Sequence, residues 1–202
     1  MKPSVLIRCA DGPCADVLRD RFAVPGLELD PDAVRVVLVA EAPPAHEEHA
    51  ALHAETTVLA FRDAGENVTS IQDVLDLGVY PTTAVKCGKT GYALSRQTVE
   101  ACSELLELEL GLFPFARAVL LMGDVAIKAV NAIARRSGEP RPVPAGATYR
   151  LRGGDYRFRG LKVFPSYVQA GPAFLIEKAK RRMIAEDIAA ALAYVRGPAA
   201  AR

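Results

Sequence analysis

Four short runs of apolar, largely β-branched or leucine-rich residues recur along the chain and predict buried strands. They lie at 33–41, 79–87, 116–122 and 161–164. Apolar runs without polar alternation are typical of strands covered on both faces. Between the last two runs, the pair Gly153-Gly154 is flanked by short segments at 148–152 and 155–159 and predicts a hairpin.

Longer segments between these runs repeat apolar residues at helical spacing. Residues 96–110 do so behind Ser95, a suitable N-cap, and further helices are expected at 124–136, at 174–195 and in part of 46–61. The first 32 residues are expected to be mostly irregular, with at most a short helix near 17–22. Strands that alternate with helices predict an α/β fold with a largely parallel sheet, in which sites form beyond the carboxyl ends of the strands.

Composition narrows the class of protein. The chain has 202 residues, of which 50% are hydrophobic, which excludes a disordered protein and predicts one domain over 1–197 with a disordered tail at 198–202. No apolar run is long enough to cross a bilayer, and the first residues resemble neither a signal nor a transit peptide. We therefore expect a monomer in the cytoplasm, where thiols stay reduced and no membrane is a partner.

The net charge of +1 conceals two opposed regions. Residues 1–116 hold 9 Lys and Arg against 18 Asp and Glu, a net of −9, whereas residues 117–182 hold 14 against 4, a net of +10. A basic region of this kind favours a polyanion such as a nucleic acid. The alternative is that the charges of both regions mix on one folded surface.

Two groups of side chains are candidates for metal binding. The four cysteines, Cys9, Cys14, Cys87 and Cys102, suit an iron–sulfur cluster or tetrahedral zinc, although free cysteines also serve as small core residues. The three histidines, His46, His49 and His53, fall within eight residues. They are interpreted either as a polar helix or as the ligands of a metal-dependent hydrolase.

Glu41 ends a strand expected to be buried, and Pro43 and Pro44 follow it at once. A carboxylate at that position projects beyond the sheet edge, where it can act as a general base or orient a water molecule. The alternative is a carboxylate that accepts hydrogen bonds from nearby backbone.

Taken in order, five segments of the chain resemble the iron–sulfur (type 4-like) uracil-DNA glycosylases of the uracil-DNA glycosylase superfamily. The segments are the cysteine pair followed by LRDRFAVPG, then VVLVAEAPPAHEE, TTAVKCGKTGY with Cys102 after it, FARAVLLMGDVAIKAV and LKVFPSYVQAG. The second and last resemble that family's two active-site motifs. The resemblance implies a three-layer α/β/α sandwich with a central four-stranded, largely parallel sheet. It also implies DNA repair by flipping a damaged base, uracil or another, out of the helix and hydrolysing its N-glycosidic bond.

The same resemblance implies a set of site residues. A [4Fe–4S] cluster with a structural role would be held by Cys9, Cys14, Cys87 and Cys102, with zinc as the alternative. The catalytic candidates are Glu41 and His46. The base-binding candidates are Ala42, Pro43, Thr83, Lys86 and Val168. The candidates for DNA contact are Gln169, Lys178, Arg181 and Arg182, with the loop at 168–171 entering the duplex.

The chain departs from the family motifs at positions that read the base. Thr83 stands where the family has an asparagine, and a hydroxyl does not offer the paired donor and acceptor of an amide. Val168 stands where the family has a histidine, which removes a hydrogen bond to the departing base. No clear aromatic residue follows Glu41 to stack on the base, and Phe61 and Tyr92 are the two that could serve. These departures predict a divergent base specificity, and the alternative is an iron–sulfur nucleic-acid-binding module without glycosylase activity.

Overall fold

A computed structural model describes residues 1–9, 12–46, 48–91 and 93–197, and the predicted tail lies outside this range. Its helices are α1 (Pro3–Leu6), η1 (Pro31–Ala33), α2 (Glu48–Asp63), α3 (Ile71–Asp76), α4 (Arg96–Leu110), α5 (Asp124–Arg136), α6 (Thr148–Leu151), α7 (Pro172–Ile176) and α8 (Lys178–Arg196). Its strands are β1 (Val17–Phe22), β2 (Val36–Ala40), β3 (Val79–Thr83), β4 (Cys87–Lys89), β5 (Ala118–Met122), β6 (Tyr156–Phe158) and β7 (Leu161–Ser166).

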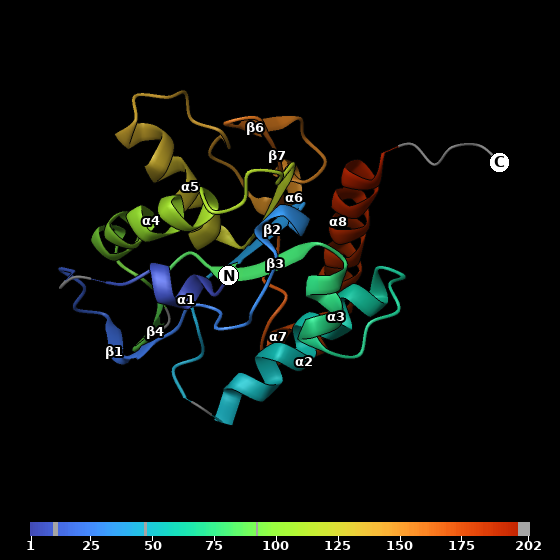
Figure 1. The fold of residues 1–202 in the computed structure, drawn as a ribbon, viewed down its shortest axis with the longest axis horizontal. Helices are drawn as coiled ribbons and strands as arrows, with labels where there is room; N and C mark the ends of the chain where they lie inside the picture. The colour runs from blue at the N-terminus through green and yellow to red at the C-terminus, as the bar shows by residue number, and fades with distance from the viewer. Residues whose placement is uncertain (10–11, 47, 92, 198–202) are drawn as a thin grey trace.

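The central sheet has the order β3-β2-β5-β7-β6, and its first four strands are parallel. Helices α4 and α5 cover one face, and α2, α3 and α8 cover the other (Figure 1). The three-layer α/β/α architecture is therefore confirmed. The sheet differs from the expected four strands by one antiparallel strand, β6, at the edge beside β7.

The position of the β6–β7 hairpin corrects a prediction. The chain turns at Arg159-Gly160, where φ is +47° and +83°, and Phe158 pairs with Leu161. Two successive positive φ angles are what a two-residue hairpin turn of type I′ requires. The segment before Gly153-Gly154 forms the short helix α6 instead of a strand, so the hairpin expected there was wrong.

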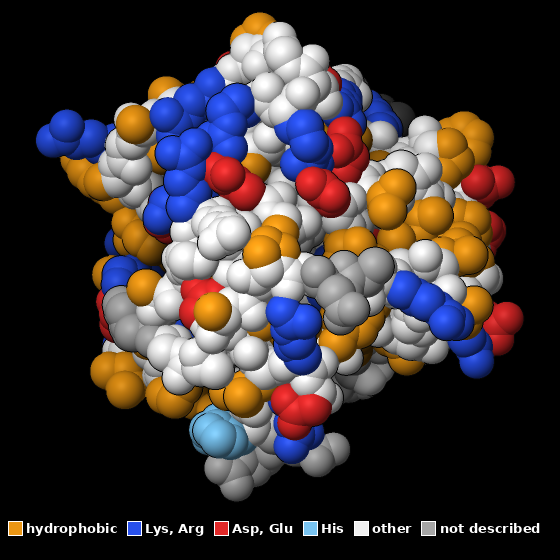
Figure 2. Space-filling view, turned by 90° about the vertical axis from the view of Figure 1, so that its left-hand side faces the viewer, with side chains coloured by type: hydrophobic (Ala, Val, Ile, Leu, Met, Phe, Trp, Pro, Cys, Tyr) orange, Lys and Arg blue, Asp and Glu red, His pale blue; other side chains and the backbone are white. Residues whose placement is uncertain are grey.

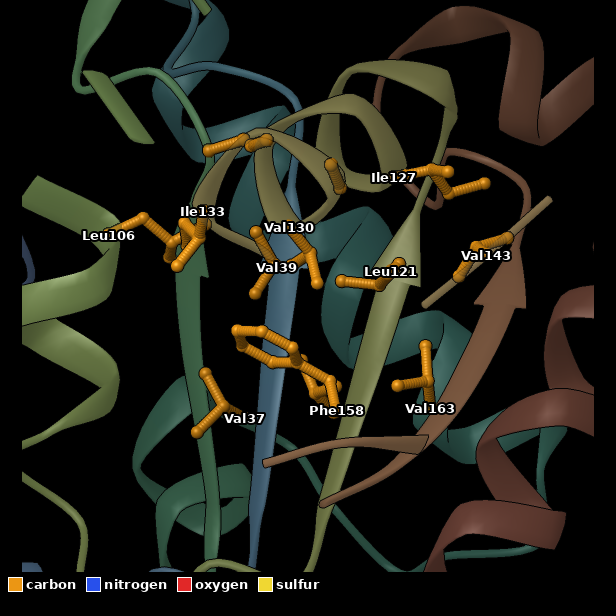
Figure 3. Close-up of a cluster of buried hydrophobic side chains, with 14 of the residues drawn as sticks. Val37, Val39, Leu106, Leu121, Ile127, Val130, Ile133, Val143, Phe158 and Val163 are labelled. Carbon is orange, nitrogen blue, oxygen red and sulfur yellow. The ribbon is translucent and has the colours of Figure 1, made fainter. Parts of the chain in front are cut away.

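The core follows directly from the apolar runs. Every residue of β2 and of β5 is buried, as strands covered on both faces should be. On one face, side chains such as Val39 and Leu121 pack against Val130 and Ile133 of α5 and Leu106 of α4 (Figure 3). The two central strands are thereby fixed, and with them the loops at their carboxyl ends.

The N-terminal segment and the last helix also differ from expectation. Residues 17–22 form β1, which pairs antiparallel with β4, and not a helix. The single helix expected at 174–195 is two helices that meet at Glu177. Within the described ranges, no helix is both long and apolar enough to cross a membrane.

Candidate functional site at the carboxyl edge of the sheet

The loops after β2, β5 and β7 meet at Gly123. Its backbone N–H donates to the carbonyl of Ser166 at 3.0 Å, and its φ of +101° suits glycine. A Cβ built on Gly123 would lie 2.5 Å from Cγ2 of Val168 and 3.1 Å from Oε1 of Glu41. The side chains of Glu41 and Val168, which belong to the two motifs, therefore lie against the same glycine.

Glu41 lines a cavity of about 500 Å³, which we name the strand-end cavity. Lys89 donates from Nζ to Oε2 of Glu41 at 3.2 Å, and both side chains are partly exposed. The other charged side chains of the wall are Asp124, Lys128, Glu177 and Lys180. The strand-end cavity thus combines three carboxylates with three ammonium groups, and each ammonium forms an ion pair with one of the carboxylates.

A second cavity, of about 270 Å³, lies beside the end of β3, and we name it the proline pocket. Its wall is largely apolar and includes Ala40, Pro43, Pro44 and Pro81. The polar side chains in the wall are Thr57, Thr82, Thr83, His53 and Gln169. A planar, largely apolar group with a few polar atoms fits such a lining.

The two cavities share their boundary segments. Ala40 lines the proline pocket and Glu41 lines the strand-end cavity. At the end of β7, Val168 lines the strand-end cavity and Gln169 lines the proline pocket. A ligand that occupied both cavities would therefore pass beside Glu41.

Lys86 is buried away from both cavities, whose walls do not include it. Its ammonium forms an ion pair with Glu109 of α4 and donates to Oγ1 of Thr82 at 2.9 Å. Tyr80 donates to the same carboxylate at 2.6 Å. Burial lowers the pKa of Lys86, and the charge of Glu109 opposes that shift. Lys86 thus joins β3 to α4 below the pocket floor.

The histidine cluster is divided by the structure. His46 and His49 are exposed, their rings 5.8 Å apart in a T-shaped arrangement, and neither lines the two cavities. His53 lines the proline pocket, and its burial lowers its pKa. Among the described residues, no three His, Cys, Asp or Glu side chains form a group that could hold a metal ion.

The four cysteines line a third cavity, of about 350 Å³, together with Arg8, Gly12, Val17, Arg19 and Phe22. A Cβ on Gly12 would lie 3.4 Å from Sγ of Cys14 and 3.8 Å from Sγ of Cys9, so both sulfurs face this glycine. Cys87 and Cys102 are buried at the inner side. The β1–β4 pairing and the start of α4 therefore bring distant cysteines to one cavity.

Burial favours the neutral thiol form of the two inner cysteines of this cavity, Cys87 and Cys102. Burial, and then the neighbouring cysteine thiolates, raise the pKa of Cys87 to about 11. Burial also raises the pKa of Cys102, although the N–H of Lys86 donates to its sulfur at 3.5 Å. Four thiolates in one cavity repel one another, and a bound cation removes that repulsion. The chemistry of the four thiols suits a metal centre, although among the described residues they do not stand together as a formed group of metal ligands.

The basic candidates differ in their availability. Arg181 forms a bidentate ion pair with Asp63, which ties α8 to α2. Lys178 is exposed, and the Arg182 side chain is 78% exposed. Figure 2 shows Lys and Arg side chains gathered in the upper part of the face that carries α4, α5 and β1, with acidic side chains beside them. The positive charge is therefore not confined to α8.

The two aromatic candidates are not placed at the pocket by the structure. Phe61 is fully buried in the core between α2 and α8, so stacking on a base is a wrong assignment for it. Tyr92 lies outside the described residues.

Three features of the site could not be predicted from the sequence. Lys89 follows Cys87 by two residues, and its partnership with Glu41 depends on the β1–β4 sheet. His53 faces the pocket because it lies one turn beyond His49 on α2. Gln169 was expected at the DNA, and only the turn after β7 directs it into the proline pocket. In each case the neighbours of the residue are set by tertiary packing, which leaves no pattern in the sequence.

Comparison with known proteins places this site in a family. The family model described as the uracil DNA glycosylase superfamily matches residues 28–190. A protein named Type-5 uracil-DNA glycosylase, from Thermus thermophilus, is 32% identical over 94 residues, which is 46% of this chain and 43% of that protein. The match thus spans less than half the length of this curated relative. With the family model covering most of the fold and the whole strand-end site, the chain belongs to the uracil-DNA glycosylase superfamily.

Proposed function

We propose that this protein is a DNA glycosylase that acts in base repair on a flipped, damaged base. The observation that carries the proposal is the pair of cavities that share a boundary at the ends of β2 and β7, with Glu41 at that boundary. A base buried in duplex DNA is out of reach of any side chain, so it must leave the stack and enter a pocket. The proline pocket would hold the base, and the strand-end cavity its sugar and phosphates.

Glu41 is the catalytic residue in this proposal. Its carboxylate would accept a proton from, or orient, the water whose oxygen bonds to the sugar C1′. As that bond forms, the N-glycosidic bond breaks, its electron pair leaves with the base, and the base then takes up a proton. Lys89, 3.2 Å from Glu41, would hold the carboxylate in place. The negative carboxylate also stabilises the positive charge that develops on the sugar.

Pro43 and Thr83 are retained as base-site residues, and Lys86 as a residue that supports them, whereas Ala42 is buried in the core outside both cavities and Val168 lines the strand-end cavity. Thr83 ends β3 at the pocket wall, and Pro43 contributes an apolar surface. Val168 offers no hydrogen bond to the leaving base, and His46 is exposed outside both cavities. We therefore assign no catalytic step to His46.

The phosphates of the DNA are proposed to contact Lys178 and Arg182, which are exposed at the start of α8. Lys128 and Lys180 line the strand-end cavity itself, in ion pairs with Asp124 and Glu177, and would meet the phosphates nearest the flipped nucleotide. Ammonium and guanidinium groups bind phosphates without regard to sequence.

We further propose that the four cysteines hold a [4Fe–4S] cluster with a structural role. Iron–sulfur clusters are held by four cysteine thiolates, and the four cysteines of this chain line one cavity. When bound, the cluster would supply four metal–thiolate bonds that join the N-terminal segment, β4 and α4. Anaerobically purified protein should contain four irons and four sulfides, and Cys102→Ser should lose them. One zinc and no iron would favour the alternative.

Activity is tested by incubating cluster-loaded protein with duplex and single-stranded oligonucleotides that each carry one modified base. Uracil, hypoxanthine, xanthine and an alkylated base form the panel, and alkali-labile abasic product is the readout. We expect release of at least one of them. Folded protein that binds DNA with a steep salt dependence, yet releases none, would support the alternative of a nucleic-acid-binding module.

A further inference from the structure

Gln169 carries an unpaired acceptor in the proline pocket. Its side chain is 1% exposed, and its Oε1 has no hydrogen-bond partner. Within the described ranges, it is the one buried side-chain nitrogen or oxygen in that state. Buried polar atoms are nearly always paired, so an unpaired acceptor in the wall of a cavity indicates a donor on the ligand.

The hydrogen-bond network fixes which end of the Gln169 amide is free. The Thr57 hydroxyl donates to the backbone carbonyl of His53 at 2.8 Å, which uses its only proton. It can therefore only accept from Gln169, and Nε2 of Gln169 lies 3.4 Å from it. Rotating the amide by 180° would place two acceptors face to face. Thr57 thus keeps the Gln169 oxygen available for the ligand.

His53 contributes a second polar group without a hydrogen-bond partner to the wall of the proline pocket. Within the part of the chain that the structure describes, its ring has no hydrogen-bond partner. Burial lowers its pKa, so at neutral pH it is an uncharged imidazole with one N–H donor and one acceptor nitrogen. The pocket therefore offers an acceptor from Gln169 and a donor from His53 between proline walls.

We propose that the proline pocket selects a base whose ring N–H stands beside a carbonyl, with Oε1 of Gln169 accepting from that N–H. Uracil, hypoxanthine and xanthine present this edge. At the same edge, cytosine and adenine present a ring nitrogen that is an acceptor. Two acceptors form no hydrogen bond, and this nitrogen would repel Oε1 of Gln169. Gln169 thereby supplies, from the end of β7, the carboxamide missing at Thr83 on the end of β3. This inference rests on the proposed function, because it names the class of base that the glycosylase would take.

Binding of free bases tests the proposal without requiring turnover. The full-length, cluster-loaded protein is titrated by NMR with 1-methyluracil and with 1-methylcytosine, which are the same size, and then with 9-methylhypoxanthine and 9-methyladenine. The methyl group blocks the ring nitrogen that carries the sugar in DNA, so that only the uracil and hypoxanthine derivatives keep a ring N–H beside a carbonyl. We expect the N–H-bearing base of each pair to bind at least about tenfold more tightly. The Gln169 side-chain amide signal should shift only with that base.

Two variants have matched controls. Gln169→Leu removes the acceptor, and the same change at the exposed Gln97 on α4 is its control. Thr57→Val frees the amide to rotate, and Thr56→Val is its control, because Thr56 is equally buried on α2 but bonds only carbonyls of its own helix. The uracil-to-cytosine ratio should fall toward one in Gln169→Leu and Thr57→Val and stay at the wild-type value in both controls.

The outcomes separate this inference from the proposed function. Selective binding that depends on Gln169, in a protein that releases no base from DNA, would uphold the inference and reject the glycosylase. If folded Gln169→Leu releases bases from DNA with the selectivity of the wild type, the proposed glycosylase activity is upheld and the role of Gln169 is overturned. Equal binding of uracil and cytosine by the wild type would also overturn it, because a solvent molecule would then satisfy Oε1.

Discussion

At the scale of single residues, Gly123 is the position where a small change should disturb the site most. An added Cβ would lie 2.5 Å from Val168 and 3.1 Å from Glu41, on a backbone with φ of +101°. Gly123→Ala should therefore cost about 1–3 kcal/mol of stability and shift Glu41. Chemical denaturation measures the first effect. Gly138→Ala is the control, since it shares a positive φ but has open space around its Cβ.

His53 should make the protein less stable in mild acid. Its folded-state pKa is lowered by burial, so below about pH 6.5 the unfolded chain binds a proton that the folded chain does not. Stability linked to His53 is thus present above pH 6.5 and is lost as the pH falls through that value. His53→Gln should reduce the loss of stability between pH 7.5 and 5.5, measured by urea unfolding.

The exposed His46 provides the comparison for that prediction. His46→Gln should leave the pH dependence of unfolding as it is in the wild type. An equal effect of the two substitutions would contradict a special environment for His53.

At the scale of elements, the buried carboxylate of Glu109 joins α4 to β3. Glu109 is 1% exposed and accepts from Tyr80, Thr82 and Lys86. Glu109→Leu would leave the Lys86 ammonium buried without its counter-charge, and should cost about 3–5 kcal/mol in urea unfolding. Glu104→Leu, on the exposed side of the same helix, should change stability by less than about 0.5 kcal/mol. A small loss in Glu109→Leu would contradict the buried pair.

The elements also show what the sequence could predict. The strands β2 and β5 and the helices α4 and α5 follow from apolar periodicity, because each buries a continuous surface. The short strand β1 did not, since its pattern of burial is mixed and its pairing depends on a partner elsewhere. The strand β6 lies in a segment expected as a hairpin arm, but its partner is β7 and not 148–152. The hairpin turn was not predicted because Arg159 occupies its first position. A positive φ, here +47°, is expected from the sequence only at residues such as glycine.

In the site, too, the sequence predicts what depends on local pattern and does not predict what depends on tertiary packing. Glu41 and the cysteines could be selected because a strand end and thiol spacing are visible in the sequence, and Thr83 because the chain resembles the family in the segment that contains it. The two cavities could not be predicted from the sequence. They depend on how the turn after β7 directs Val168 into one cavity and Gln169 into the other. His53 and Lys89 were missed for the same reason, as their neighbours are set by packing and not by spacing.

At the scale of the whole molecule, DNA affinity should depend on salt through the exposed cations of α8. The double variant Lys178→Ala/Arg182→Ala should weaken binding to all sequences alike and reduce the slope of log affinity against log salt by about 2. Fluorescence anisotropy with a labelled duplex measures both. Arg62→Ala, an exposed arginine on α2 outside the basic region, should leave the slope unchanged. An unchanged slope in the double variant would place the DNA elsewhere.

The most direct test is release of the free base under single-turnover conditions by wild-type protein and by Glu41→Gln, followed by mass spectrometry. The wild type should convert a uracil- or hypoxanthine-containing strand into free base and an abasic strand. Glu41→Gln should bind the same DNA but release the base about 10²–10⁴-fold more slowly. Equal rates for the two proteins, or an intact strand with folded, DNA-bound wild type, would contradict catalysis at the boundary between the two cavities.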